Sequence, residues 1–352
     1  MYLNLWIISF RSSLVVPCPT NDERSRRDGV RRIGQVSAQT EIELDGQYRQ
    51  LREECGLLDR SERGKLLVTG ADGAEYLQGQ LTSDVEALEP GEGQYAALLD
   101  RKGHMQADMR VLRAGPEEIW VDTEAVAIAA ASRHLQMYSI GRDVKVEDVG
   151  AERAILSLIG PRSAEIAGTP PLPENACEKT AVAGVECLAA GTAAGIDLIA
   201  AAGEAERLRD ALLAAGADAV SAAAAEILRV EAGTPRFGAE MGTATMPAEA
   251  GIVERAVSFT KGCYIGQETV ARLHYKGRPN RHLRGLRLSA PAEPGAALLL
   301  GEKEVGKLGG AVVSPAFGPI GLAILRREAE PGAELAVGED GVTAAVVDLP
   351  FG

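Results

Sequence analysis

The chain has 352 residues, of which 46% are hydrophobic and 25% charged, and its formal net charge is −13. This composition excludes wholesale disorder, and the length exceeds what one hydrophobic core usually supports, so we expect two or three domains. The acidic balance disfavours direct binding of nucleic acid, tRNA included. Five cysteines without a C-x-x-C pair predict neither a disulfide scaffold nor a zinc knuckle, and they favour a reducing cytoplasm. No run of 18 apolar residues is present, so we expect no membrane span.

Residues 1–37 differ in composition from the rest of the chain. An apolar start is followed by a charge-rich segment over residues 22–32. A signal peptide would carry a positive residue before the apolar stretch and an A-x-A site after it, and neither is present. We interpret residues 1–37 as a disordered extension or as a translation start placed too early.

The first regular elements are predicted between residues 47 and 146. The periodicity predicts the order β-α-β-β-α-β with one extra strand, after an opening helix. Asp72 and Glu75 have the spacing of a capping box, which predicts the start of the second helix. The expected elements are helix 47–58, strand 64–70, a helix after residue 72, strands 94–99, 105–112 and 118–122, helix 124–138 and strand 144–146.

A second set of elements repeats this pattern. Two consecutive split β-α-β units predict two ferredoxin-like lobes, with the repeat boundary near residue 150. After residue 284, short apolar runs alternate with turn signals, which predicts a small β-barrel. The expected fold class is therefore α+β, with two ferredoxin-like βαββαβ lobes over residues 38–283 and a C-terminal β-barrel over 284–352; that the lobes are interleaved is implied by the family resemblance given below. The second set comprises strand 154–159, helical turn 162–167, strands 185–188 and 195–201, helix 204–215 and strand 219–220.

Two common site patterns are absent. Gly301 to Lys307 has the spacing of a phosphate loop, but Leu308 follows where Ser or Thr is required, and the context is a β-hairpin. The four histidines lack metal-ligand spacing, so the sequence leaves any metal unknown.

The segment 261–288 concentrates the chemical signal. It begins KGCYIGQE and carries seven cationic residues against one acidic residue, a net charge of +6 in an acidic chain. Lys261 lies two residues from Cys263, where it is placed to lower the pKa of the thiol. The competing interpretation is a packed thiol, because a free cysteine is most often a small buried apolar residue. The basic strip predicts an anionic partner.

The run KGCYIGQE resembles the signature of YgfZ-type folate-binding proteins in the glycine-cleavage T-protein superfamily. The stretches YLQGQ, TSDV, LDRKG and LRVEAG agree in the same order, and the resemblance covers about residues 45–350. It implies two interlocked ferredoxin-like lobes around a central pocket for tetrahydrofolate or a derivative, with a C-terminal barrel. The signature residues are Lys261, Gly262, Cys263, Tyr264, Gly266, Gln267 and Glu268.

The same resemblance implies a set of folate-binding residues. Asp108 matches the carboxylate beside the reactive nitrogens of the folate, Tyr95 matches a folate-contacting Tyr, and Asp197 matches an acidic residue that faces the pterin. Asp197 lies in an apolar strand, where an unpaired carboxylate is costly, and a carboxylate can accept both N–H groups of the pterin edge. The alternative is that Asp197 points to solvent.

Several positions depart from the aminomethyltransferases of this superfamily. Ala225 replaces a folate-contacting Arg, residues 190–194 lack the Tyr and Glu of a GYTGE loop, and Cys263 stands where those enzymes carry Asp. These departures speak against glycine-cleavage chemistry and leave the enzyme status open, whereas folate binding is retained.

The resemblance implies a folate-dependent accessory protein for iron–sulfur cluster assembly or repair. Its partners would be iron–sulfur client or assembly proteins, and it would support tRNA modification by a cluster enzyme, with Cys263 as the reactive thiol. The anion that the basic strip binds would then be a polyglutamylated folate tail, an acidic client protein or, less favoured, tRNA. The alternative is a tetrahydrofolate-dependent aminomethyltransferase or demethylase that uses Asp108 in acid/base catalysis.

Overall fold

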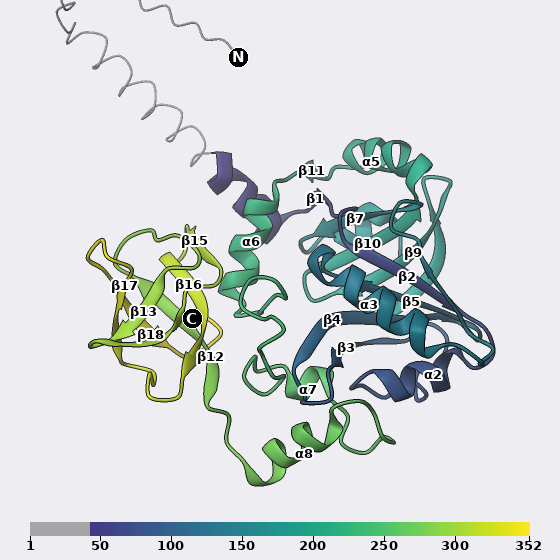
Figure 1. Cartoon of the computed structure of the whole chain (residues 1–352). Helices are drawn as coiled ribbons and strands as arrows, with labels where there is room; N and C mark the ends of the chain where they lie inside the picture. Colours follow the sequence, from purple (N-terminus) through teal and green to yellow (C-terminus); the bar gives the residue numbers. More distant parts are fainter. Residues whose placement is uncertain (1–42) are drawn as a thin grey trace, which may run out of the picture. The chain divides into compact units, whose positions relative to one another are not determined.

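The computed structural model describes residues 43–352, and three β-sheets with their covering helices account for most of that range (Figure 1). The interpretation of residues 1–37 as an extension concerns a segment outside the described residues. No helix in the described part is long and apolar enough to cross a membrane.

The first sheet has five antiparallel strands in the order β3-β4-β5-β2-β6. Helix α3 covers it with Ala127, Ala131 and Leu135, which recur every four residues and therefore share one face. The predicted capping box is wrong, because the Asp72 carboxylate accepts a hydrogen bond from Asp143 N at 2.9 Å and caps no helical N–H. The elements are β2 (Gly64–Thr69), α2 (Gly73–Gln80), β3 (Gly93–Leu99), β4 (Met105–Gly115), β5 (Glu118–Thr123), α3 (Ala125–Tyr138) and β6 (Lys145–Asp148).

The second sheet has six strands in the order β11-β1-β7-β10-β9-β8. Strand β1 precedes the first sheet in sequence, yet it inserts between β7 and β11 of the second, so the two halves are interleaved. The helix predicted over 47–58 ends at residue 53, because Gly56 begins the apolar strand that pairs with β7. The elements are β1 (Gly56–Asp59), β7 (Arg153–Ile159), α4 (Ser163–Ala167), β8 (Cys177–Val182), β9 (Val185–Thr192), β10 (Gly195–Ala201), η1 (Ala202–Glu204), α5 (Ala205–Ala214) and β11 (Asp218–Ala219).

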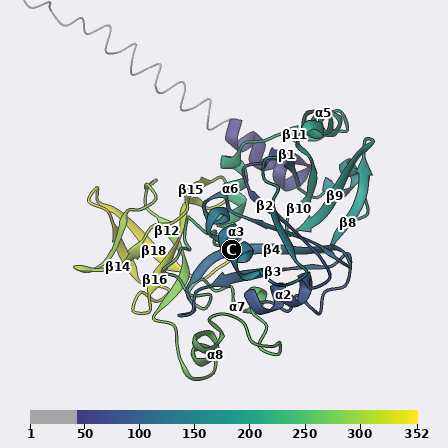
Figure 2. The same cartoon turned by 45° about the vertical axis from the view of Figure 1, so that its right-hand side comes forward.

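The first and second sheets lie next to each other (Figure 2), and apolar side chains fill the interface between them. Leu112 and Trp120 of the first sheet pack with Ile155, Leu188 and Ile199 of the second. Separate clusters join α3 to the first sheet and α4 and α5 to the second. Because side chains alternate between the two faces of a strand, polar residues at the ends of β4, β5 and β10 can gather beside this apolar interface.

The segment after the second sheet contains α6 (Ala222–Glu231), α7 (Val253–Ala256) and α8 (Gln267–Lys276), and the sequence predicted none of these three helices. A curled seven-stranded sheet follows, in the order β14-β13-β17-β18-β12-β16-β15. The predicted barrel is corrected to this open sheet, because no ladder among the described residues joins its edge strands β14 and β15. The α+β class is confirmed. The strands are β12 (Arg281–Leu288), β13 (Ala297–Leu300), β14 (Lys303–Lys307), β15 (Ala311–Ser314), β16 (Gly318–Arg326), β17 (Glu334–Val337) and β18 (Val342–Val347).

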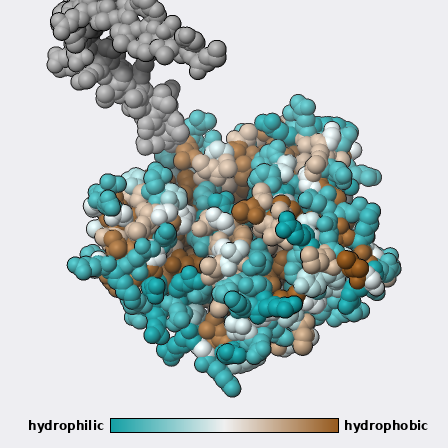
Figure 3. All heavy atoms as spheres, in the orientation of Figure 1, coloured by the Kyte–Doolittle hydropathy of each residue, from teal (hydrophilic) through white to brown (hydrophobic). Residues whose placement is uncertain are grey.

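The face drawn in Figure 3 is mostly hydrophilic, with apolar residues confined to small areas. Among residues 43–352, large apolar side chains that are strongly exposed are few, and they include Ile140 and Tyr275. Scattered exposed apolar residues are normal on a folded protein. The polar and charged side chains that are buried inside the protein are therefore the more informative feature.

Candidate functional site

A cavity of about 460 Å³ lies where the ends of β4, β5 and β10 meet α6 and the loop at 234–236. This volume is within the range of small-molecule sites. Tyr95, Asp108 and Asp197 all line it, so the structure brings together the three residues that the sequence predicted to contact folate. Asp197 is buried, which excludes the alternative that it points to solvent.

Asp108 presents one free carboxylate oxygen inside this region. The Tyr95 hydroxyl donates to Asp108 Oδ2 at 2.7 Å, whereas the buried Asp108 Oδ1 has no hydrogen-bond partner. Burial raises the pKa of Asp108, and the hydrogen bond from Tyr95 opposes that rise. Burial and the neighbouring carboxylate raise the pKa of Tyr95 as well, so Tyr95 remains a proton donor. The arrangement supplies a carboxyl group that can exchange a proton with a ligand at Oδ1.

Asp197 is held in place by two neighbours from different strands. The register places Asp197 opposite Ser157, whose Oγ donates to Asp197 Oδ1 at 2.6 Å. Arg110 Nη2 forms an ion pair with Asp197 Oδ2 at 2.8 Å. Each carboxylate oxygen keeps a second lone pair, so Asp197 can still accept two hydrogen bonds from a planar ligand edge.

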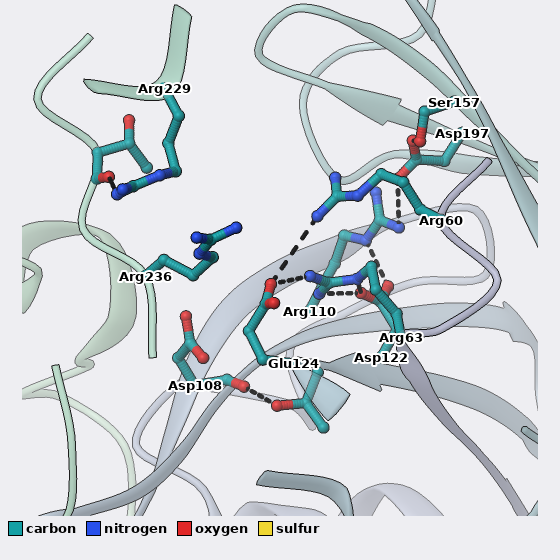
Figure 4. Close-up of polar contacts among 12 residues, drawn as sticks. Arg60, Arg63, Asp108, Arg110, Asp122, Glu124, Ser157, Asp197, Arg229 and Arg236 are labelled. Carbon is teal, nitrogen blue, oxygen red and sulfur yellow. Dashed lines mark hydrogen bonds and ion pairs between the residues drawn. The ribbon is translucent and has the colours of Figure 1, made fainter. Parts of the chain in front are cut away.

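Asp122 joins two buried guanidinium groups (Figure 4). The register places Arg110 opposite Asp122, and Arg110 Nε donates to Asp122 Oδ2 at 2.7 Å. Arg63 Nη2 lies 2.5 Å from Asp122 Oδ1. The two cations hold the pKa of Asp122 far below its ordinary value, although burial alone would raise it. Asp122 thereby fixes Arg110, and Arg110 fixes Asp197.

Glu124 completes the charged wall beside Asp108. Arg63 forms an ion pair with Glu124, and Arg60 Nη2 lies 3.8 Å from Glu124 Oε1. The Glu124 charge contributes to the raised pKa of Asp108. Sequence reasoning missed this charged network. The available signal was the presence of charged residues in otherwise apolar strands, as in MQADMRVL and EIWVDT.

The α6 side of the cavity contains a second ion-pair cluster. Arg229 contacts Glu226 through Nη2 at 2.6 Å and Glu240 through Nη1 at 2.9 Å. Arg236 Nη2 reaches Glu226 at 3.2 Å. Ala225 of α6 lines the cavity, and so do residues 192–194 at the turn from β9 to β10. Two of the departures from the aminomethyltransferases therefore border the cavity, whereas the third, Cys263, does not.

The signature loop is placed differently from what its sequence suggested. Lys261 Nζ is buried and donates to the carbonyl oxygens of Gln78, Leu81 and Ser83 at 2.5–2.7 Å. Burial lowers the pKa of Lys261 to about 8. All of its hydrogen bonds go to these carbonyls, so the structure gives no support to activation of the Cys263 thiol by Lys261.

The glycine of the same loop makes a close backbone contact. Gly266 has φ of 86°, and a Cβ there would lie 2.5 Å from the carbonyl oxygen of Asp100. Only glycine accommodates both constraints. Cys263 is exposed, and it is not among the residues that line the cavity. Its assignment as a reactive residue stays a prediction. Tyr264 is buried, Gln267 begins α8, and Glu268 is exposed and pairs with Arg272 at 3.1 Å.

The cavity fits a reduced folate on the chemistry of its donors and acceptors. The unpartnered Asp108 Oδ1 can accept from, or donate to, a ring nitrogen, and Asp197 offers the paired acceptors that a pterin edge requires. In the described part of the chain, no group of three His, Cys, Asp or Glu side chains could hold a metal ion.

The two adjoining sheets, the strand β1 that links them and the polar cavity define a class of α+β proteins with interleaved halves and an internal polar site. The crystal structure of glycine cleavage system aminomethyltransferase T from Bartonella henselae has this fold, with a TM-score of 0.80 and 23% identity over 88% of this chain and 89% of that one. The model of the GCVT N-terminal domain matches residues 37–261. The chain belongs to this family, whose one-carbon carrier is tetrahydrofolate, in agreement with the predicted cofactor.

Several curated relatives are named aminomethyltransferase. The aminomethyltransferase of Thermus thermophilus is 31% identical, covering 86% of this chain and 88% of its own length. Those of Rubrobacter xylanophilus and Listeria welshimeri are each 29% identical, covering 94% and 88% of this chain.

These findings correct the predicted function. The KGCYIGQE resemblance predicts an accessory protein for iron–sulfur cluster assembly, with cluster-enzyme clients and a link to tRNA modification. The named aminomethyltransferases at about 30% identity contradict that function, and they favour the alternative that the sequence left open. The error came from weighting one contiguous motif above the resemblance of the whole chain.

Proposed function

We propose that this protein is a tetrahydrofolate-dependent aminomethyltransferase whose folate lies in the 460 Å³ cavity. The observation that carries the proposal is the Asp108 carboxyl, with Oδ2 held by Tyr95 and Oδ1 free. The names of the curated relatives support the same activity.

The proposed chemistry assigns separate tasks to the cavity residues. Bound tetrahydrofolate supplies the nitrogen that receives the one-carbon unit. Asp108 exchanges a proton at Oδ1, because a carboxyl whose pKa is raised by burial can hold a proton closer to neutral pH. Tyr95 fixes the orientation of that carboxyl. Asp197 accepts from the pterin edge, while Ser157 and Arg110 restrict its rotation.

The finer assignments stay proposals as well. We propose that the sheets derive from two ferredoxin-like lobes, with domains at 38–283 and 284–352, and that KGCYIGQE marks the YgfZ-type branch of the superfamily. The donor of the aminomethyl group would be a lipoyl-carrying protein of glycine cleavage. The small residues at Ala225 and 192–194 alter the shape of the cavity and leave the Asp108 carboxyl in place.

The test is tetrahydrofolate-dependent release of ammonia from an aminomethylated lipoyl carrier. Wild-type protein should release ammonia, and Asp108→Asn should be slower by about 10²–10⁴-fold, the usual contribution of a general acid or base. Asp210→Asn, an exposed carboxylate on α5, is the matched control and should keep the wild-type rate. Absence of ammonia release by the wild type would reject the proposed function.

A further inference from the structure

A second and larger cavity lies next to the candidate folate cavity. Its volume is about 1170 Å³, and it is bordered by α6, the loop after it and strands β14 and β16 of the C-terminal sheet. Ala222, Glu226 and Arg236 line both cavities. The two cavities therefore adjoin each other at these three residues.

The wall between the two cavities is a fixed structure. Glu240 is fully buried, accepts from Gly310 N at 2.7 Å and pairs with Arg229. A Cβ at Gly310, between β14 and β15, would lie 2.4 Å from Arg229 Nη2, so a larger residue there would have to displace the Arg229 guanidinium. The C-terminal sheet is thereby attached to the same arginine that borders the folate cavity.

The charges that line the second cavity fall into two groups. Glu226 and Glu240 are neutralised by Arg229 and Arg236, and Arg281 is neutralised by Glu249 at 2.8 Å.

The remaining charges are uncommitted. Lys307 and Arg326 are exposed on β14 and β16, and no ion pair is formed by either within residues 43–352. Glu304 is the single carboxylate left to oppose them among the lining residues. This end of the cavity is therefore cationic, while the end shared with the folate cavity is electrically balanced.

From this arrangement we infer that the second cavity binds the γ-glutamyl tail of a polyglutamylated folate. The inference rests on the proposed function. Each added γ-linked glutamate brings one carboxylate, and Lys307 and Arg326 supply the cations that such a chain requires. Arg236 borders both cavities, and the first carboxylates of a tail that extends from one cavity to the other would pass beside it.

The structure favours this cavity over the basic strip that the sequence singled out. Lys261 is buried against backbone carbonyls, and Arg272 on α8 is paired with Glu268. No residue of α8 lines either cavity. Of the strip, only Arg281 borders the second cavity, and it is already committed to Glu249.

The test compares the dissociation constants of tetrahydrofolate carrying one and five glutamates. For the wild type, the longer tail should bind about tenfold more tightly, equal to about 1.4 kcal/mol, and added salt should reduce that ratio. In the double variant Lys307→Gln and Arg326→Gln, the ratio should fall close to one. The matched control, Arg272→Gln with Lys276→Gln on α8, should keep the wild-type ratio. Thermal melting of each variant checks that it is folded.

Each possible outcome of this comparison either supports or overturns the inference. A wild-type ratio near one, or a tenfold ratio that persists in the Lys307 and Arg326 variant, would overturn the inference and leave the proposed function standing. Loss of the ratio in the α8 control would place the tail on the basic strip. Failure of the one-glutamate form to bind the wild type would overturn the proposed function and this inference together.

Discussion

The candidate folate cavity and the 261–268 loop are built in opposite ways. The cavity gathers polar side chains and their partners from five separate strands, β3, β4, β5, β7 and β10. The loop is contiguous, and its most buried polar group, Lys261 Nζ, is used to satisfy backbone carbonyls. A conspicuous run of residues can thus serve to hold backbone segments together, while the residues proposed to act on the ligand come from several separate strands.

Removing the central carboxylate of the cavity should have the largest effect on stability. Asp122→Asn leaves Arg63 and Arg110 without their shared counter-charge, and breaking a buried ion pair costs about 3–5 kcal/mol. Because the folded-state pKa of Asp122 is depressed, the stability it contributes is present above about pH 4 and is lost as the pH falls. Denaturant unfolding at neutral and acidic pH measures the free energy lost in the variant and the pH dependence of the wild-type stability. A cost below about 1 kcal/mol at pH 7 would show that the network is not structural.

The Lys261→Met variant tests whether the hydrogen bonds from Lys261 to backbone carbonyls stabilise the fold. Three buried carbonyls lose their donor, which should cost about 2–3 kcal/mol. Part of the loss is offset because methionine carries no charge to desolvate, and burial already lowers the pKa of Lys261 to about 8. The exposed Lys276→Met is the matched control. Equal stability of the two variants would contradict the structural role.

Asp108→Asn should stabilise the protein at neutral pH, a smaller effect of opposite sign. The folded-state pKa of Asp108 is raised, so the folded protein is more stable at low pH, where the carboxyl is neutral. That stability is lost as the pH rises through the raised pKa and the carboxyl becomes charged. Asparagine stays neutral throughout. The melting temperatures of wild type and variant should therefore converge near pH 4 and diverge toward pH 7. A difference that does not depend on pH would mean that burial does not control the titration of Asp108.

The exposed thiol should have the smallest effect. In a Cys18→Ser background, alkylation should modify Cys263 first, because Cys55, Cys177 and Cys187 are buried and burial raises their pKa values. Tetrahydrofolate affinity should change by less than about twofold, as for a surface substitution. A large loss of tetrahydrofolate affinity after alkylation would show that the 261–268 loop takes part in binding, and would contradict the difference proposed between the loop and the cavity.

Much of the strand content followed from local pattern. The expected strands at 94–99, 105–112 and 195–201 agree with β3, β4 and β10 in position, because period-two alternation and apolar runs are strong signals. Helix α8 and the insertion of β1 were missed. Strand insertion depends on which distant segments pair, and no local pattern records that choice.

The site was predictable only in part. Tyr95, Asp108 and Asp197 were found through resemblance, and all three line the cavity. The supporting pairs were not found, because the register that sets Arg110 opposite Asp122 is a property of the assembled sheet. Charged residues inside apolar strands mark such pairs as candidates, but partners become visible only when the strands are paired.

The central claim, that the cavity holds tetrahydrofolate against Asp197, is tested most directly by isothermal titration of tetrahydrofolate into wild type and Asp197→Asn. The asparagine replaces one acceptor oxygen with a donor nitrogen, so binding should weaken by about 1.5–3 kcal/mol, the range for a hydrogen bond to a charged group. Thermal melting confirms that the variant is folded. The account predicts measurable binding by the wild type and a clear loss in the variant. Equal affinities, or no binding heat with the wild type, would contradict it.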